Sequence, residues 1–220
     1  KLFFWMLLFG TVFAILFSYY IYKKNFGSDL FKLILYMPQI ISSIVIVIMY
    51  KFFVTLAIPE LFEKVFNSNI EGLLSNPKTV KPTLIFYNVW ISFGTQVLIY
   101  SSTMSGVSDS VIESAQLDGA SPFRELISIV LPAIWPTFIT FMLMRIVGLF
   151  TDQMNLFSFY GGSAEYSLYT FGYFLFNEVS KNEIIKYPYL SAFGLLLTVV
   201  AVPLVLSVKY LLEKFGPSVE

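Results

Sequence analysis

Residues 107–136 read VSDSVIESAQLDGASPFRELISIVLPAIWP, and this stretch predicts two short helices joined at a glycine. Apolar residues recur at helical spacing on both sides of Gly119. Glycine is favoured just beyond a helix end because it accepts a left-handed backbone conformation. Ser121 followed by Pro122 is a typical start for a second helix, and Pro132 is expected to end it. We call residues 107–132 the elbow.

The elbow mixes charged and apolar side chains. Ser110 and Glu113 have the spacing of a capping box at the start of the first helix. Asp118, Arg124 and Glu125 add further charge among exposed valine, leucine and isoleucine. A plain linker between two membrane spans predicts no such mixture, whereas reversible protein contact favours one. From periodicity alone, a linker and a docking surface both stay open.

Composition places the chain in a membrane. Hydrophobic residues make up 57% of the 220 residues and charged residues only 13%. A soluble domain of this size cannot bury so much apolar surface, so lipid must cover part of it. The net charge of zero argues against nucleic acid as a partner. The lack of cysteine and histidine removes disulfides and thiolate or imidazole metal ligands, and we expect no metal site.

Five stretches are long and apolar enough to cross about 30 Å of hydrocarbon as helices. They are residues 2–22, 30–58, 84–106, 133–150 and 188–212. A sixth apolar piece, 167–176, is too short and predicts an external or re-entrant hairpin. We therefore expect one all-α polytopic transmembrane helix bundle over residues 1–220, with the elbow between the third and fourth spans.

The short linker 23–30 sets the expected orientation. It carries Lys23 and Lys24, and positively charged short loops face the cytoplasm. Alternation then puts the elbow and the C-terminal tail in the cytoplasm, and loops 59–83 and 151–187 outside. Several lysines in those two outer loops oppose this bias, although long loops translocate largely regardless of charge. Residue 1 would lie outside, so we expect at least one further span to precede it.

The elbow resembles the EAA loop of type I ABC importer permeases, the inner-membrane components of binding-protein-dependent transport systems. That loop has the pattern Glu-Ala-Ala, three residues, Gly, nine residues, Ile, one residue, Leu-Pro. This chain departs from it only at Ser114, where the family has alanine. The resemblance implies that the residues coupling the chain to an ATPase are Glu113, Ser114, Ala115, Leu117, Asp118, Gly119, Ala120, Ile129, Leu131 and Pro132.

The same resemblance implies a set of partners. ATP-binding cassette ATPase subunits would hold ATP and Mg, so this chain would bind no cofactor and would not be an enzyme. A second permease subunit would complete a homodimer or heterodimer, and an extracytoplasmic solute-binding protein would deliver cargo. The expected location is the bacterial or archaeal cytoplasmic membrane, as a multi-pass protein. The glycine pair Gly161 and Gly162 lacks the Gly-Lys-Ser/Thr that a phosphate-binding loop needs.

Polar stripes on the spans predict a solute path. Polar groups avoid lipid, so these faces look into the bundle. They either form hydrogen bonds between helices or line a wet cavity for a hydroxyl-rich solute, and we favour the cavity for the third span. Resemblance to the carbohydrate-uptake branch implies sugar contacts around 92–96 and 144–152, although Ser163 stands where that branch often has proline. The candidate residues are Gln39, Ser43, Asn88, Ser92, Thr95, Gln96, Met144, Arg145, Gly148, Thr151 and Asp152.

Arg145 is the charge that a membrane span tolerates least, and three partners are considered for it. It pairs with Asp152, pairs with an acid of a partner subunit, or contacts an anionic group on the solute. We leave these open.

We expect a permease for a sugar or an oligosaccharide. The alternatives within the class are permeases for an amino acid, phosphate or glycerol phosphate. An ion-coupled secondary transporter would need carboxylates at mid-membrane, and spans one, two, three and five have none. A membrane enzyme would need clustered catalytic groups, and only Asp152, Asn155 and Glu165 are near one another, loosely spaced.

Overall fold

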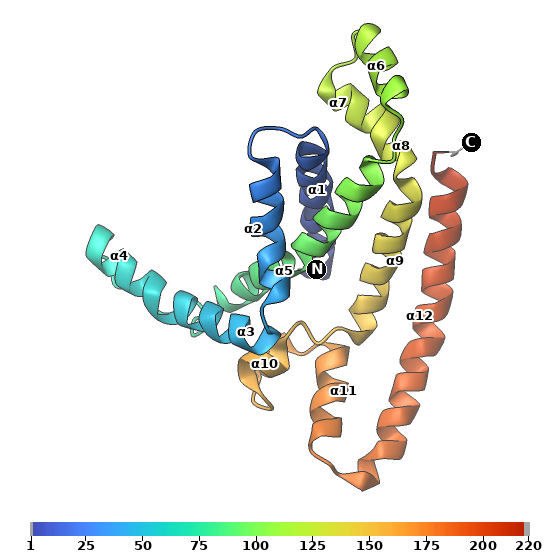
Figure 1. The fold of residues 1–220 in the computed structure, drawn as a ribbon. Helices are drawn as coiled ribbons and strands as arrows, with labels where there is room; N and C mark the ends of the chain where they lie inside the picture. Colours follow the sequence, from blue (N-terminus) through green and yellow to red (C-terminus); the bar gives the residue numbers. More distant parts are fainter. Residues whose placement is uncertain (1, 218–220) are drawn as a thin grey trace.

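The computed structural model of the chain is a bundle of helices (Figure 1). It describes the backbone of residues 2–217 and the side chains from residue 7 onward, and this part contains no strand. The predicted all-α class is therefore confirmed for the described residues. The long elements of the bundle are α1 (Leu2–Tyr22), α2 (Ser28–Ile40), α5 (Val80–Met104), α9 (Trp135–Thr151) and α12 (Tyr187–Phe215).

Three helical segments of the described chain are long and apolar enough to cross a membrane. They are Ser43–Phe66, Val80–Met104 and Ile184–Phe215. A fourth crossing is possible if Pro122–Ala133 and Trp135–Thr151, which meet at a bend of 75°, form one broken span. The apolar part of α1, Leu7–Tyr22, is shorter. Helices therefore cover most of the predicted ranges, with one exception.

The exception is the range 30–58, which is not one helix. Helix α2 ends at Ile40, Ile41 has an extended backbone (φ −79°, ψ 141°), and α3 (Ser43–Phe52) starts afresh. Serine side chains compete with the backbone for hydrogen bonds and favour helix starts over helix interiors, which fits a break at Ser42. The chain then continues through a π-helical segment, η1 (Phe53–Ala57), into α4 (Ile58–Phe66). Figure 1 shows this continuous arm leaving the bundle sideways.

Helix α5 is the centre of the bundle, and α1 and α2 both pack against it. The contact with α2 depends on Gly94, because a Cβ atom there would lie 2.4 Å from the Leu35 carbonyl oxygen and 3.0 Å from the Tyr36 Cα. No residue larger than glycine fits at this crossing of α2 and α5 unless the two helices separate.

The buried core consists of two apolar clusters. One surrounds the fully buried Tyr87, and the other surrounds the fully buried Tyr100.

The two ends of the bundle carry different connections. The turn between α1 and α2, the elbow, and the end of α12 lie together at the top of Figure 1. The loop 152–186 lies at the opposite end and contains α10 (Leu156–Tyr160), η3 (Tyr166–Leu168), α11 (Phe171–Ser180) and η4 (Ile184–Lys186). The short apolar piece 167–176 lies within this loop and packs on the bundle through α11, which contacts α9 and α12.

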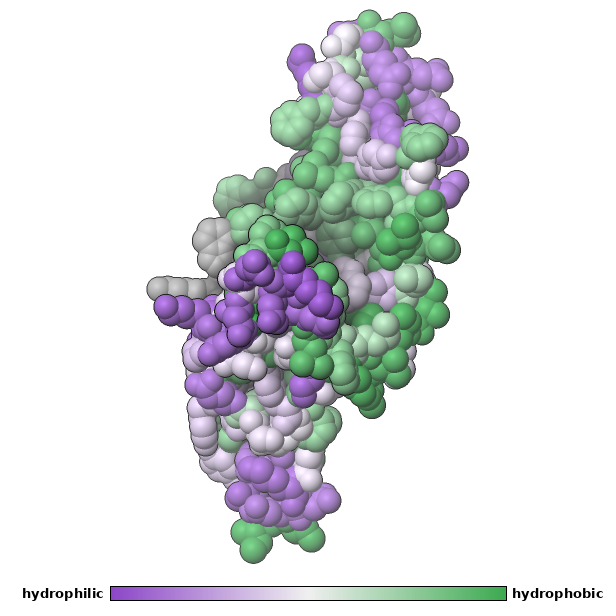
Figure 2. Space-filling model, turned by 90° about the vertical axis from the view of Figure 1, so that its left-hand side faces the viewer, coloured by the Kyte–Doolittle hydropathy of each residue, from purple (hydrophilic) through white to green (hydrophobic). Residues whose placement is uncertain are grey.

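Figure 2 shows hydrophilic residues gathered at both ends of the molecule. The surface between them is largely hydrophobic, apart from a hydrophilic group where the α4 arm points toward the viewer. A hydrophobic band between two polar ends is the surface that a bilayer requires. The arrangement therefore agrees with the composition.

We predict that Gly94→Ala destabilises the chain by about 1–3 kcal/mol, because an added methyl group in a close-packed crossing forces the backbones apart. The measurement is the midpoint of thermal unfolding in detergent. Gly194→Ala in α12 is the matched control, since a Cβ atom at Gly194 meets nothing within 4 Å. Equal midpoints for the two variants would show that the α2–α5 crossing does not need its glycine.

Candidate coupling elbow and solute path

The elbow consists of two helices that meet at a glycine, as predicted. Helix α6 (Asp109–Leu117) ends at Asp118, and Gly119 follows with φ +80°. The Ser121 side chain then accepts a hydrogen bond from the Arg124 amide at the start of α7 (Pro122–Glu125). The left-handed turn is open to solvent, because a Cβ atom at Gly119 would meet nothing within 4 Å. The turn therefore allows a side chain sterically but strains its backbone.

Of two expectations about the ends of these helices, one is wrong. Ser108, not Ser110, is the residue before α6, so the capping box does not form. Ser110 lies in the first turn, where its carbonyl oxygen accepts a hydrogen bond from the Ser114 hydroxyl. The second expectation is correct to within one residue, because the helical segment that runs from Pro122 through α8 (Leu131–Ala133) ends directly after Pro132.

The helix breaks only at Ile134, just before α9. Between α7 and α8 the chain forms a π-helical segment, η2 (Leu126–Val130).

Half of the residues expected to couple to an ATPase are exposed on the elbow. Leu117 is 89% exposed, and Phe123, which was not among the expected residues, is 68% exposed. The opposite side of the elbow faces the core, where Ile112 and Leu126 pack in the apolar cluster around Tyr100. Of the expected residues, Glu113, Ser114, Leu117, Asp118 and Gly119 are exposed, while Ala115, Ala120, Ile129, Leu131 and Pro132 are half-buried.

Glu125 differs from the sequence expectation, because its side chain is not exposed but only 2% accessible. Lys23 Nζ, at the end of α1, lies 2.7 and 2.9 Å from the two carboxylate oxygens. Gln116 of α6 donates a hydrogen bond to Oε2 at 3.1 Å, and the Tyr19 hydroxyl lies 3.0 Å from Oε1. The Tyr19 hydroxyl is also 3.0 Å from the Pro122 carbonyl oxygen. We call Tyr19, Lys23, Gln116 and Glu125 the polar brace.

The brace keeps its carboxylate ionised. Burial alone would raise the pKa of the Glu125 carboxyl. The hydrogen bonds from Lys23, Gln116 and Tyr19, together with the charge of Lys23, outweigh burial and hold that pKa below its usual value. The sequence signal for this pair is a lone acid in the run FRELISIV on the expected cytoplasmic side, where Lys23 also lies, and no spacing rule connects residues so far apart.

The polar stripe on α5 is largely used in contacts between helices. Asn88 donates hydrogen bonds to the carbonyl oxygens of Leu84 and Met154, and its own side-chain oxygen accepts one from Asn155. Gln39 of α2 donates to the Ile91 carbonyl oxygen. Asn88 and Gln96 are buried, Thr95 is half-buried and Ser43 is exposed. For Gln39 the structure therefore favours the helix-to-helix interpretation that the sequence left open, whereas Asn88 bonds within α5 and to the loop after α9.

Arg145 of α9 is held by neutral groups. Its Nη2 donates to the Ser92 hydroxyl at 3.0 Å. With the Gln96 amide turned so that its oxygen faces the guanidinium, Gln96 accepts hydrogen bonds from Nε (3.1 Å) and Nη2. Within the described residues Arg145 forms no ion pair with Asp152, whose carboxylate instead accepts a hydrogen bond from the Met154 amide at 2.7 Å. The positive charge of Arg145 therefore has no neutralising contact in the described chain.

Two cavities adjoin the same face of α9. One, of about 600 Å³, lies between α5, α9 and the loop before α12, and is lined by Lys81, Tyr169 and Thr170 as well as α9 residues. The other, of about 960 Å³, lies between α9 and α12. Met144, Gly148 and Asp152 line both; Arg145 lines only the first and Thr151 only the second. All the candidate path residues at α9 thus line at least one of the two cavities, whereas those of α2, α3 and α5 line neither.

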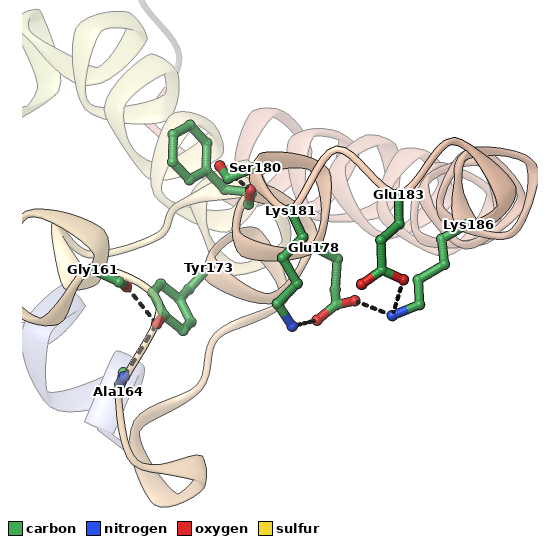
Figure 3. Close-up of polar contacts among 9 residues, drawn as sticks. Gly161, Ala164, Tyr173, Glu178, Ser180, Lys181, Glu183 and Lys186 are labelled. Atoms are coloured by element: carbon green, nitrogen blue, oxygen red, sulfur yellow. Dashed lines mark hydrogen bonds and ion pairs between the residues drawn. The ribbon is translucent and has the colours of Figure 1, made fainter.

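The end opposite the elbow is held by Tyr173 and by ion pairs (Figure 3). The fully buried Tyr173 hydroxyl donates to the Gly161 carbonyl oxygen at 2.7 Å and accepts from the Ala164 amide at 3.3 Å. Glu178 pairs with Lys181 and with Lys186. The hydrogen bond from Lys181 is the main cause that lowers the pKa of Glu178. These contacts fold loop 152–186 on itself.

We predict that Tyr173→Phe loosens residues 161–164 while leaving the helices intact, because it removes the partner of a buried amide and of a carbonyl oxygen. The expected cost is about 1–3 kcal/mol. Hydrogen exchange of the Ala164 amide measures it, with faster exchange expected. Tyr187→Phe is the control, since the Tyr187 hydroxyl has only an exposed contact with Asn182. Unchanged exchange at Ala164 would contradict the role given to the Tyr173 hydroxyl.

Known proteins with similar sequences are membrane transport components. A probable ABC transporter permease protein of Mycoplasma pneumoniae is 27% identical over 138 residues, which are 61% of this chain and 40% of the relative. Protein LplB of Bacillus subtilis is 27% identical over 194 residues, which are 82% of this chain and 57% of the relative. The chain thus spans between 40% and 57% of the length of these two curated relatives.

A solved structure has the same fold. It is described as a bacterial alginate ABC transporter in complex with an alginate pentasaccharide-bound periplasmic protein. One of its chains superposes with a TM-score of 0.78 at 22% identity, covering 94% of this chain and 73% of that one. The fold expected from the elbow is therefore confirmed.

The family model described as "Binding-protein-dependent transport system inner membrane component" matches residues 7–220. Because the match covers nearly the whole sequence, this chain belongs to the family of binding-protein-dependent transport system inner membrane components.

Proposed function

We propose that this chain is the membrane-spanning permease subunit of an ATP-driven importer, and that its elbow docks on a separate ATPase. The observation that carries the proposal is the elbow itself. It presents exposed apolar and charged side chains around an open left-handed turn at Gly119, at one end of a membrane bundle. Exposed apolar residues mixed with charges on a rigid support are typical of a protein-docking surface. The family membership supports the same function.

The proposal requires partners. ATP and Mg would bind to cassette ATPase subunits, since the glycine pair at Gly161 and Gly162 has no phosphate-binding motif around it. A second permease subunit would face the cavity between α9 and α12. A solute-binding protein would meet the end that carries loop 152–186, and the periplasmic protein in the alginate transporter complex supports this partner. The elbow end would then face the cytoplasm of a bacterial or archaeal cell.

A carbohydrate is the solute that the comparisons favour. The periplasmic protein of the solved transporter holds an alginate pentasaccharide. In this chain, the cavity wall combines aromatic rings, including Tyr169 and Phe171, with hydroxyl groups such as Thr170. Aromatic faces and hydroxyl groups suit sugar rings, which present both apolar and polar sides.

A solute with an anionic group is the second candidate, and a specific feature favours it. Among the described residues of the smaller cavity's wall, Lys81 and Arg145 carry two positive charges and Asp152 one negative charge, so the wall keeps a net positive charge. The hydrogen bonds of Arg145 in the described chain go to the neutral groups of Ser92 and Gln96 and not to Asp152. An acidic sugar, a phosphate ester or an amino acid would supply the missing negative charge.

The docking proposal predicts that Gly119→Asp abolishes binding of the ATPase while the chain stays in the membrane. The new side chain adds a carboxylate and backbone strain on the docking surface, while its Cβ atom meets nothing within 4 Å. The amount of ATPase subunit that co-purifies with the tagged chain measures the effect, and we expect a loss of more than about tenfold, or about 1.4 kcal/mol.

Gly27→Asp is the matched control for this experiment. Gly27 also has a left-handed backbone (φ +73°) with nothing within 4 Å of a Cβ atom, but it lies outside the elbow. Normal co-purification of the ATPase with the Gly119→Asp chain would count against the docking role.

The two solute candidates predict different effects of Lys81→Gln. This change removes a positive charge from the cavity wall. A pair of unit charges about 4 Å apart is worth about 1 kcal/mol even in water, so uptake of an acidic solute should show an apparent KM about fivefold higher. Uptake of a neutral sugar should not change. Competition of labelled uptake by neutral and uronate-containing oligosaccharides, in proteoliposomes holding the whole importer, separates the two cases.

A further inference from the structure

The polar brace joins three elements that the sequence separates. Glu125 belongs to α7, Gln116 to α6, and Lys23 and Tyr19 to α1. Its carboxylate is 2% accessible and its ammonium partner 24% accessible, so the ion pair lies largely out of water. Removing one partner of a buried ion pair leaves a charge without compensation, which strongly favours keeping the pair closed.

The brace spans the glycine turn. Gln116 precedes Gly119 and Glu125 follows it, so their hydrogen bond of 3.1 Å closes the angle between α6 and α7. A turn at glycine is otherwise soft, because glycine loses the most conformational freedom on ordering. The hydrogen bond therefore gives the elbow one fixed shape.

The brace also connects the elbow to the cavity through α1. Near its middle, α1 brings Gly10 next to Arg145, where a Cβ atom would lie 3.5 Å from Nη2. In between, the Ser18 hydroxyl lies 3.2 Å from the Val97 carbonyl oxygen of α5. A displacement of the elbow that moves α1 therefore reaches the helices that hold the cavity wall.

We propose that Glu125 and Lys23 are positioning residues that make the elbow and α1 move as one rigid body, so that motion of a docked ATPase passes to α1 rather than being lost in the glycine turn. The inference rests on the proposed docking of the elbow. It differs from that proposal because it concerns residues behind the docking surface, which the ATPase would not touch.

Spin labels test the rigid connection directly. The chain has no cysteine, so single cysteines introduced at Ser110 in α6 and at Phe26 in the turn after α1 label the two bodies, and both positions are exposed. Pulsed electron spin resonance then gives the distribution of distances between the labels. With the brace intact we expect one narrow distribution in the purified chain. In the assembled importer it should stay the same with and without ATP and Mg.

Breaking the brace should change this result. Lys23→Met and Glu125→Gln should each broaden the distribution, and ATP should shift its centre by up to about one helical turn, or about 5 Å. Lys23→Arg should keep the narrow distribution, and the exchange Lys23→Glu with Glu125→Lys should restore it. Lys64→Met is the matched control, since it breaks an ion pair with Glu60 on the exposed α4 arm. Lys23→Met serves alone if Glu125→Gln fails to accumulate.

The outcomes separate the two proposals. A narrow, ATP-independent distribution in both Lys23→Met and Glu125→Gln overturns the brace, as does a wild-type distribution that shifts with ATP. Co-purification of the ATPase should remain within about twofold of wild type in Lys23→Met, because the exposed surface is untouched, and a larger loss would contradict the assignment to positioning. If the ATPase fails to co-purify with the wild-type chain, docking fails, while the label distances in the purified chain still test the brace.

Discussion

A charge or hydrogen-bonding group that faces lipid has no water to satisfy it, and this constraint organises the whole structure. The polar side chains of α5 are turned into the bundle, where Asn88 reaches the Met154 carbonyl oxygen and Gln96 faces Arg145. The helices must approach closely for such short side chains to reach, and Gly94 permits this at the crossing with α2. The same rule acts at the elbow, where Glu125 is buried only because Lys23, Gln116 and Tyr19 surround it. Close helix packing is thus what allows the buried polar groups of this chain to form their hydrogen bonds, mainly along α5.

Much of the fold could be predicted because the signals were local. Apolar length alone placed the third, fourth and fifth spans close to α5, α9 and α12. Glycine chemistry placed the turn at Gly119, where the backbone has φ +80°. The break at Ser42 could not be predicted with the same ease, since long apolar stretches flank it on both sides and only Pro38, Gln39 and the serine pair 42–43 interrupt them. Pro132 gave the end of the helical segment Pro122–Ala133 to within one residue, because proline disfavours continuation of a helix beyond it.

The residues of the candidate site likewise fall into those that local sequence patterns predict and those that they do not. The exposed ridge of the elbow follows from a fixed local pattern, so residue spacing was sufficient to find it. The brace joins residues about a hundred positions apart, and no periodicity connects Lys23 with Glu125. For the polar stripe on α5, periodicity correctly predicted which face turns into the bundle. It did not predict whether each residue of that face contacts other parts of the chain or lines a cavity. Asn88 meets the loop after α9, and Arg145 meets both a helix and a cavity. Only the three-dimensional arrangement of α9 separates these cases.

The two cavities and the elbow are related by the stiffness of the elements between them. Helix α9 continues from the elbow with a 75° bend at Ile134, and its far half carries Arg145, Gly148 and Asp152 on one face. Helix α1 runs beside it from the brace to Gly10, which is in contact range of the same guanidinium. Two helices therefore connect the elbow to Arg145, one through a bend and one through an ion pair. A bend transmits little torque unless something fixes its angle, whereas a buried ion pair between the elbow and a straight helix holds both position and direction. Of the two connections, the one through α1 is therefore the better suited to carry motion across the membrane.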